Sequence, residues 1–209
     1  MKKRLGLIAV IRETCHFIEE WLWFHHFAGI EKFMIAVNAD DPLGFQEIYE
    51  KVKELPFAED ICLHQYCRNC CNAEMYRRLI EQYKTDVQWM ILAETCEFFF
   101  SPEGLDLKDV LRPFDRVDCG GIIIPCTQMG LNGFVHPPPL PVTDHILLQQ
   151  PRPQQSQYKV IFKTSAYTGC DYDWFVNVSK PYLYQDGECI MELATSSLQF
   201  PQNCLHFVY

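Results

Sequence analysis

Short apolar runs recur along the first hundred residues, separated by segments that mix apolar and polar side chains. The segments 5–11, 33–37, 60–66 and 89–93 have the length and composition of β-strands. Three segments between them are predicted to be helices: residues 17–28, 45–55 and 72–84. The first of these helices carries apolar side chains at helical spacing, and Gly29 follows it as a stop signal.

This alternation of strands and helices indicates an α/β fold. Short connections favour right-handed crossovers, which give a mainly parallel central sheet flanked by helices. The second half adds a short predicted helix near residues 105–111 and extended segments at 120–125, 158–164 and 182–193. Nothing in the sequence suggests a second domain, so we expect residues 1–209 to form a single domain.

The charge balance narrows the classes of function. The chain has a net charge of −9, which argues against nucleic-acid binding because that relies on basic surfaces. The chain begins with basic residues and an apolar run, as signal peptides do, but the run ends at Arg12 without a small-residue cleavage site. No stretch is long enough for a transmembrane segment. We therefore expect a cytoplasmic protein, which is compatible with a peripheral membrane contact.

Eleven cysteines are scattered through predicted strands and loops. Their odd number, in a chain without a secretion signal, favours reduced thiols over disulfides. The one cluster is Cys67, Cys70 and Cys71, which Cys62 or His64 could complete as a zinc site. No second pair with matching spacing follows, so zinc remains an alternative interpretation.

Polar side chains that could carry chemistry follow three predicted strands. Parallel sheets bind ligands at the carboxyl ends of their strands. The candidates at those ends are Arg12 and Glu13, then Asn38, Asp40 and Asp41, then Glu94, Cys96 and Glu97. Asn38, Asp40 and Asp41 could contact a base or ribose. The same residue types are common in turns, which explains them equally well.

Glu94 and Cys96 are spaced like an acid-x-acid pair. Such a pair at a strand end can hold a divalent cation that bridges a diphosphate and offsets charge on the leaving nucleoside diphosphate. Cys96 is a soft ligand, which suits magnesium poorly and manganese or zinc better. Taken alone, two solvated glutamates at a strand end are the simpler interpretation.

The histidines give a weaker signal. His25 and His26 are adjacent on a predicted helix and therefore face different ways, so we expect a hydrogen-bonded, partly buried His25 and no metal ligand. His136 and His206 each follow a segment that could border a cleft, although a lone histidine is more often structural. The motifs of α/β-hydrolases, P-loop enzymes and dinucleotide-binding enzymes are absent from the sequence.

Six segments in order resemble those of glycosyltransferase family 92 and related family-2-like glycosyltransferases. These are the opening at 8–33, the strand ending at Asn38, and the segments 89–102, 129–134, 158–161 and 205–207. Together they span nearly the whole chain, which makes the set more specific than any one motif. The resemblance implies a GT-A (Rossmann-like) fold, a nucleotide-sugar donor and a manganese or magnesium ion.

The resemblance also implies roles for the candidate residues. It makes residues 1–102 the nucleotide-sugar-binding half and residues 103–209 the acceptor-side half. Glu13, Asn38 and Asp41 would line the nucleotide-sugar site, to which we also assign the neighbouring Arg12 and Asp40. Glu94 and Cys96 would occupy the metal positions, and Glu97 would match the motif's conserved acid. An inverting transfer also needs a base for the acceptor hydroxyl, and Glu97 is the candidate. On the acceptor side the counterparts would be Gly130, Gly133, His136 and His206.

The chain departs from the family pattern within these motifs. Arg12 stands where the family has Asn, Val37 where it has Asp, and Phe134 where it has His. Both aspartates of the metal motif are replaced, by Glu94 and Cys96. The cation at Arg12 could take over phosphate neutralisation from a missing metal.

The sequence leaves two main interpretations. The first is a glycosyltransferase that moves a sugar from a nucleotide sugar, a UDP-sugar by preference, to a glycan or lipid-linked acceptor with inversion. The second is a catalytically inactive relative that serves as a binding or scaffolding protein. The Glu94 and Cys96 pair discriminates between them, because catalysis of this kind needs the diphosphate charge to be neutralised.

Overall fold

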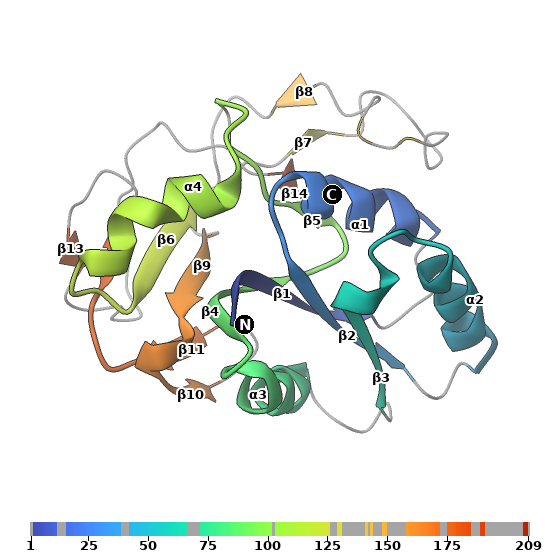
Figure 1. Cartoon of the computed structure of the whole chain (residues 1–209), viewed down its shortest axis with the longest axis horizontal. Coiled ribbons are helices and arrows are strands. Elements are labelled where there is room, and N and C mark those ends of the chain that lie inside the picture. Colours follow the sequence, from blue (N-terminus) through green and yellow to red (C-terminus); the bar gives the residue numbers. More distant parts are fainter. Residues whose placement is uncertain are drawn as a thin grey trace.

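The computed structural model of the protein describes residues 2–11, 16–38, 42–66, 72–101, 103–125, 129–130, 141, 143, 148–149, 158–171, 175–184, 189–190 and 207–208 (Figure 1). Its first half alternates strands and helices as predicted. The strands are β1 (Lys3–Ile11), β2 (Lys32–Asn38), β3 (Ile61–Tyr66) and β4 (Val87–Ala93). The helices between them are α1 (Ile18–Phe27), α2 (Pro42–Lys53) and α3 (Asn72–Tyr83), with the 3-10 turn η1 (Ala58–Asp60) before β3.

The second half is richer in short strands than the sequence indicated. Three predicted elements are present as α4 (Leu107–Leu111), β6 (Gly121–Pro125) and β9 (Tyr158–Lys163). The predicted extended segment at 182–193 contains two strands that pair as a hairpin, β12 (Tyr182–Tyr184) and β13 (Cys189–Ile190). The remaining elements are β5 (Glu97–Phe98), η2 (Arg112–Arg116), β7 (Met129–Gly130), β8 (Leu148–Gln149), η4 (Thr164–Ala166), β10 (Tyr167–Asp171), β11 (Phe175–Val178) and β14 (Phe207–Val208).

An eight-stranded sheet has the order β13-β12-β6-β9-β4-β1-β2-β3. The neighbouring pairs β3–β2, β2–β1, β1–β4 and β6–β12 are parallel. β9 lies between β4 and β6 and is antiparallel to both. The predicted α/β class with a mainly parallel central sheet is confirmed, whereas the reversed β9 was not foreseen.

Helices cover both faces of this sheet. Alternate residues of β1 point to opposite faces, as a strand requires. Leu5 and Leu7 pack in a core with α1, α2 and α4, whereas Ile8 and Val10 pack in a second core with α3. Figure 1 shows α3 on the side of the sheet opposite α1 and α2. The layering is therefore the predicted Rossmann-like one.

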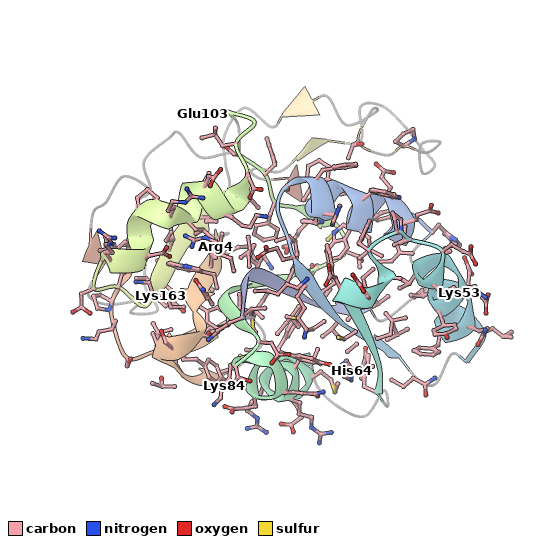
Figure 2. All side chains as sticks on the ribbon, viewed as in Figure 1. Arg4, Lys53, His64, Lys84, Glu103 and Lys163 are labelled. Carbon is pink, nitrogen blue, oxygen red and sulfur yellow. The ribbon has the colours of Figure 1, made fainter. Side chains whose placement is uncertain are left out.

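Charged side chains lie mainly at the outside of these layers. Figure 2 shows Lys53 at the end of α2 and Lys84 after α3 pointing away from the sheet. Their side chains are 44% and 37% exposed and pair with nearby glutamates. Among the helices that the structure describes, none is long and apolar enough to cross a membrane.

The end of α1 is joined to the start of α4. Gly29 has a φ of 106°, a conformation that favours glycine. Next to it, the carbonyl of Ala28 accepts a hydrogen bond of 2.9 Å from the backbone N–H of Leu107. The Asp106 carboxylate caps α4 by accepting from the Lys108 N–H at 2.7 Å. A Cβ atom at position 29 would collide with that carboxylate, so the junction needs glycine.

Candidate functional site

The carboxyl ends of β1, β2 and β4 lie at one edge of the sheet. Ile11 at the end of β1 pairs with Val37, and Ala93 at the end of β4 pairs with Ala9. The chain therefore leaves the three strands from neighbouring positions, as a shared ligand site requires.

The predicted nucleotide-sugar-binding residues lie at, or shortly after, the ends of β1 and β2 in the sequence. Asn38 is the last residue of β2, and its side chain is not among those that the structure describes. Arg12, Glu13, Asp40 and Asp41 lie outside the described residues. Their roles stay predictions.

A tight turn follows β4 and contains the predicted metal positions. The N–H of Glu97 donates to the carbonyl of Glu94 at 3.0 Å. In the opposite direction, the N–H of Glu94 donates to Oε2 of Glu97 at 3.0 Å. Glu97 thus closes the turn with both its backbone and its carboxylate. Within the turn, the Cys96 thiol lies 3.5 Å from Oε2 of Glu94, so the two predicted metal positions are brought together.

The chemistry of this pair suits a cation only in part. Burial raises the pKa of the Cys96 thiol to about 12, and the charges of Glu94 and Glu97 act in the same direction. A metal ion would have to displace this proton to bind the sulfur. No three His, Cys, Asp or Glu side chains gather to hold a metal ion in the described part of the chain. Glu94 and the buried Glu97 are the hard donors of the turn, so a magnesium or manganese ion there would need donor phosphates and waters as further ligands.

Glu97 is buried rather than open to a substrate. Its side chain is 5% exposed, and Oε1 forms an ion pair of 2.7 Å with Nζ of Lys159, which is 12% exposed. Burial raises the pKa of the Glu97 carboxyl, and the Lys159 ammonium opposes that rise. Both carboxylate oxygens thus have partners. A role as general base would require this buried side chain to become accessible to the acceptor.

Helix α1 fixes the segment that follows the turn. Nε1 of Trp21 donates to the carbonyl of Glu97 at 2.8 Å. One helical turn later, His25 is fully buried, with Nδ1 2.8 Å from the Trp21 carbonyl and Nε2 accepting from the Phe99 N–H at 3.0 Å. A neutral imidazole with its proton on Nδ1 satisfies both contacts. The expected hydrogen-bonded role of His25 is confirmed, with complete rather than partial burial.

Segments from the second half reach the same region. Phe207 and Val208 of β14 pair with Phe98 and Glu97 of β5, so the backbone directly after His206 lies beside the turn. The Glu20 carboxylate of α1 accepts from the N–H and the hydroxyl of Thr143 at 2.9 and 2.8 Å.

The acceptor-side candidates are only partly described. Gly130 lies in β7 and pairs with Leu148 of β8. Gly133, His136 and His206 lie outside the described residues. Acceptor binding by these residues stays a prediction.

The thiols agree with the expected reduced state where the structure describes them. Cys62, Cys96, Cys119 and Cys170 are free, and the last two are buried. The proposed zinc ligands Cys67, Cys70 and Cys71 lie outside the described residues. His64, which could have joined them, has Nε2 2.7 Å from the Tyr83 hydroxyl.

Lys159 is the site residue that the sequence analysis did not assign. It belongs to one of the six resembling segments, but nothing in that segment gave it a role. The available signal was a lysine directly before the apolar run Val160–Phe162 of the strand Tyr158–Lys163. A charge in such a strand needs a partner, and which carboxylate supplies it depends on how β9 is placed in the sheet.

Comparison with known proteins gives only distant likenesses. No protein-family model matches the chain, and no curated protein matches it. Among solved structures, the chain is similar to 4-diphosphocytidyl-2C-methyl-D-erythritol synthase from Anaerococcus prevotii, with a TM-score of 0.48, 9% identity, and coverage of 78% of this chain and 71% of that one. It is also similar to a structure described as a glucose-1-phosphate thymidylyltransferase from Bacillus anthracis, with a TM-score of 0.41, 10% identity and coverage of 78% and 72%. These likenesses are too distant to say what the chain does.

Proposed function

We propose that the protein is a nucleotide-sugar-dependent transferase, and more specifically a glycosyltransferase that passes a sugar to a glycan or lipid-linked acceptor. The observation that carries the proposal is the turn after β4, which brings Glu94 and Cys96 within 3.5 Å of each other at the ligand-binding edge of the sheet. The six-segment resemblance supports the same site. A UDP-sugar donor and an inverting outcome belong to this proposal, as does a cytoplasmic location.

In this proposal each residue of the site has its own role. Glu94 supplies a carboxylate, and Arg12 supplies a positive charge for the donor's diphosphate. A manganese or magnesium ion, when bound, would neutralise charge on the leaving diphosphate. Glu97 would take the acceptor proton only after its side chain, which is 5% exposed, became accessible to the acceptor.

The first test is calorimetric titration of UDP and UDP-sugars, with and without manganese. The wild type is compared with Cys96→Asp, which replaces the thiol by a hard ligand. We expect Cys96→Asp to bind UDP with manganese about tenfold more tightly than wild type, about 1.4 kcal/mol. Cys62→Ser, a thiol removed from β3 instead, is the matched control and should bind as wild type does. If neither wild type nor Cys96→Asp binds any nucleotide, the donor site is refuted.

A second candidate function is a catalytically inactive relative that binds without transferring. The replacement of both aspartates of the metal motif by Glu94 and Cys96 favours it, because a thiol is a poor ligand for magnesium and the other carboxylate of the turn, Glu97, is buried in an ion pair. In this case wild type would show no manganese-dependent binding, whereas Cys96→Asp would gain it. Manganese-dependent binding by wild type would instead support a working transferase.

A further inference from the structure

Two opposite charges are buried together beside the turn. The Glu97 and Lys159 side chains are 5% and 12% exposed, and their charged atoms are 2.7 Å apart. Removing an ion from water costs several kcal/mol unless a partner offsets the loss. Each of these two charges therefore depends on the other.

The geometry of the carboxylate links this pair to the turn. Lys159 engages Oε1 of Glu97, and Oε2 accepts the N–H of Glu94. A carboxylate held at one oxygen has its other oxygen fixed in direction. The ion pair thus orients the acceptor that closes the turn, and the closed turn keeps the Cys96 thiol 3.5 Å from Oε2 of Glu94.

The position of Lys159 in the sheet makes it suited to this task. β9 pairs with β6 over Tyr158–Phe162, where Lys159 lies opposite Ile124, and with β4 over Ile161–Lys163. Ile161 lies on the same face of β9 as Lys159 and is 3% exposed in the core that contains α1. The lysine therefore projects from a fixed strand and not from a loop.

We propose that Lys159 is a positioning residue: through its buried ion pair with Glu97 it sets the conformation of the Glu94–Glu97 turn and so the candidate donor site. The functional part of this inference rests on the proposed function. A competing role is direct contact of Lys159 with the donor diphosphate. In that role Lys159 would hold the ligand itself, and its loss would weaken nucleotide binding without changing the conformation of the turn.

The test compares four variants. Lys159→Met removes the cation, and Lys159→Arg keeps it. Glu97→Gln combined with Lys159→Met removes both charges but leaves an amide oxygen to accept the Glu94 N–H. Lys163→Met is the matched control, because Lys163 lies on the same face of the same strand but donates to the Val117 carbonyl at 2.6 Å.

The main readout needs no nucleotide. Alkylation of Cys96 at fixed pH, followed by peptide-resolved mass spectrometry, reports how well the turn is closed. We expect Lys159→Met to raise the alkylation rate about tenfold, since an unpaired buried charge opens the turn. Lys159→Arg, the double variant and Lys163→Met should stay within about twofold of wild type, because none of them leaves an unpaired charge at Glu97.

Three outcomes would overturn the inference. The first is an unchanged rate in Lys159→Met, and the second is an equal rise in Lys163→Met. The third is a double variant that remains as reactive as Lys159→Met, which would mean that Lys159 does not act through Glu97. If Lys159→Met does not fold, folding of the double variant would show that the lysine is needed because of the Glu97 charge, whereas failure of the double variant as well would overturn the inference.

Nucleotide titration of the same variants separates the two proposals. Where wild type binds UDP, Lys159→Met should bind it at least threefold more weakly, about 0.7 kcal/mol, and Lys159→Arg should bind as wild type does. Loss of UDP binding in Lys159→Met without a raised alkylation rate would assign Lys159 to the ligand instead. Absence of binding by wild type would refute the donor site alone, and the alkylation rates would still decide the positioning role.

Discussion

At the scale of single residues, His25 shows how one buried side chain joins two elements. Its ring connects the Trp21 carbonyl in α1 to the Phe99 N–H after β5, and it is fully buried. Burial lowers the pKa of His25 from 6.5 to about 4. The folded protein therefore holds this imidazole neutral at pH values where an unfolded chain would protonate it.

This difference makes stability depend on pH. Between pH 6.5 and about 4 the unfolded chain binds a proton at His25 that the folded chain does not. The free energy of unfolding should then fall with decreasing pH, by up to about 1.4 kcal/mol per pH unit from this residue. In His25→Gln that part of the slope should disappear. Urea unfolding at several pH values measures it.

The adjacent histidine supplies the control for this measurement. His26 is only partly buried and stacks on Phe57 at 4.0 Å between ring centroids. His26→Gln should retain the wild-type slope in the acid range. An identical slope in wild type and His25→Gln would show that His25 does not titrate as the structure implies.

At the scale of elements, the junction of α1 with α4 depends on Gly29. We expect Gly29→Ala to destabilise the protein by about 2–4 kcal/mol, because the methyl group meets the Asp106 carboxylate and the φ of 106° strains any side chain. Urea unfolding measures the change. Gly104 has a φ of 70° with nothing within 4 Å of an added Cβ, so Gly104→Ala should cost only about 1 kcal/mol. Equal losses of stability in Gly29→Ala and Gly104→Ala would mean that the Asp106 carboxylate moves away from the added methyl group at no cost in free energy.

At the scale of the whole molecule, stability should decrease from the middle of the sheet to its edge. β1 and β4 have a strand on each side, whereas β3 is an outermost strand of the sheet. Hydrogen exchange of the hydrogen-bonded amides should be slowest in β1 and β4, with opening free energies about 2 kcal/mol or more above those of β3. Equally slow exchange in β3 would indicate that another chain covers this edge.

Much of the fold could be predicted from the sequence because its information is local. The apolar run at 5–11 and the helical spacing of 17–28 correspond to β1 and α1 within two residues at each end. Gly29 ends α1 where its residue type indicated. Patterns of burial repeat with the period of each element, so residues close in sequence suffice to reveal them.

The direction of β9 could not be predicted in the same way. The pattern of a strand is the same whichever way the strand runs. The sequence of Tyr158–Lys163 therefore predicts an extended segment, but neither its direction nor the strands that pair with it. The short pairings of β14 with β5 and of β7 with β8 were missed for a related reason. Two-residue strands carry too little periodicity to stand out from a loop.

The sequence by itself determined the α/β class, the order of the main elements and the strand end where Glu94 and Cys96 lie. Only the tertiary structure decided that Glu97 is buried against Lys159 and that α1 holds the backbone on either side of Phe98. The first set follows from periodicity and residue type, which neighbouring residues express. The second set depends on contacts between residues more than sixty positions apart, and the energy of a buried charge is fixed by what the fold places beside it.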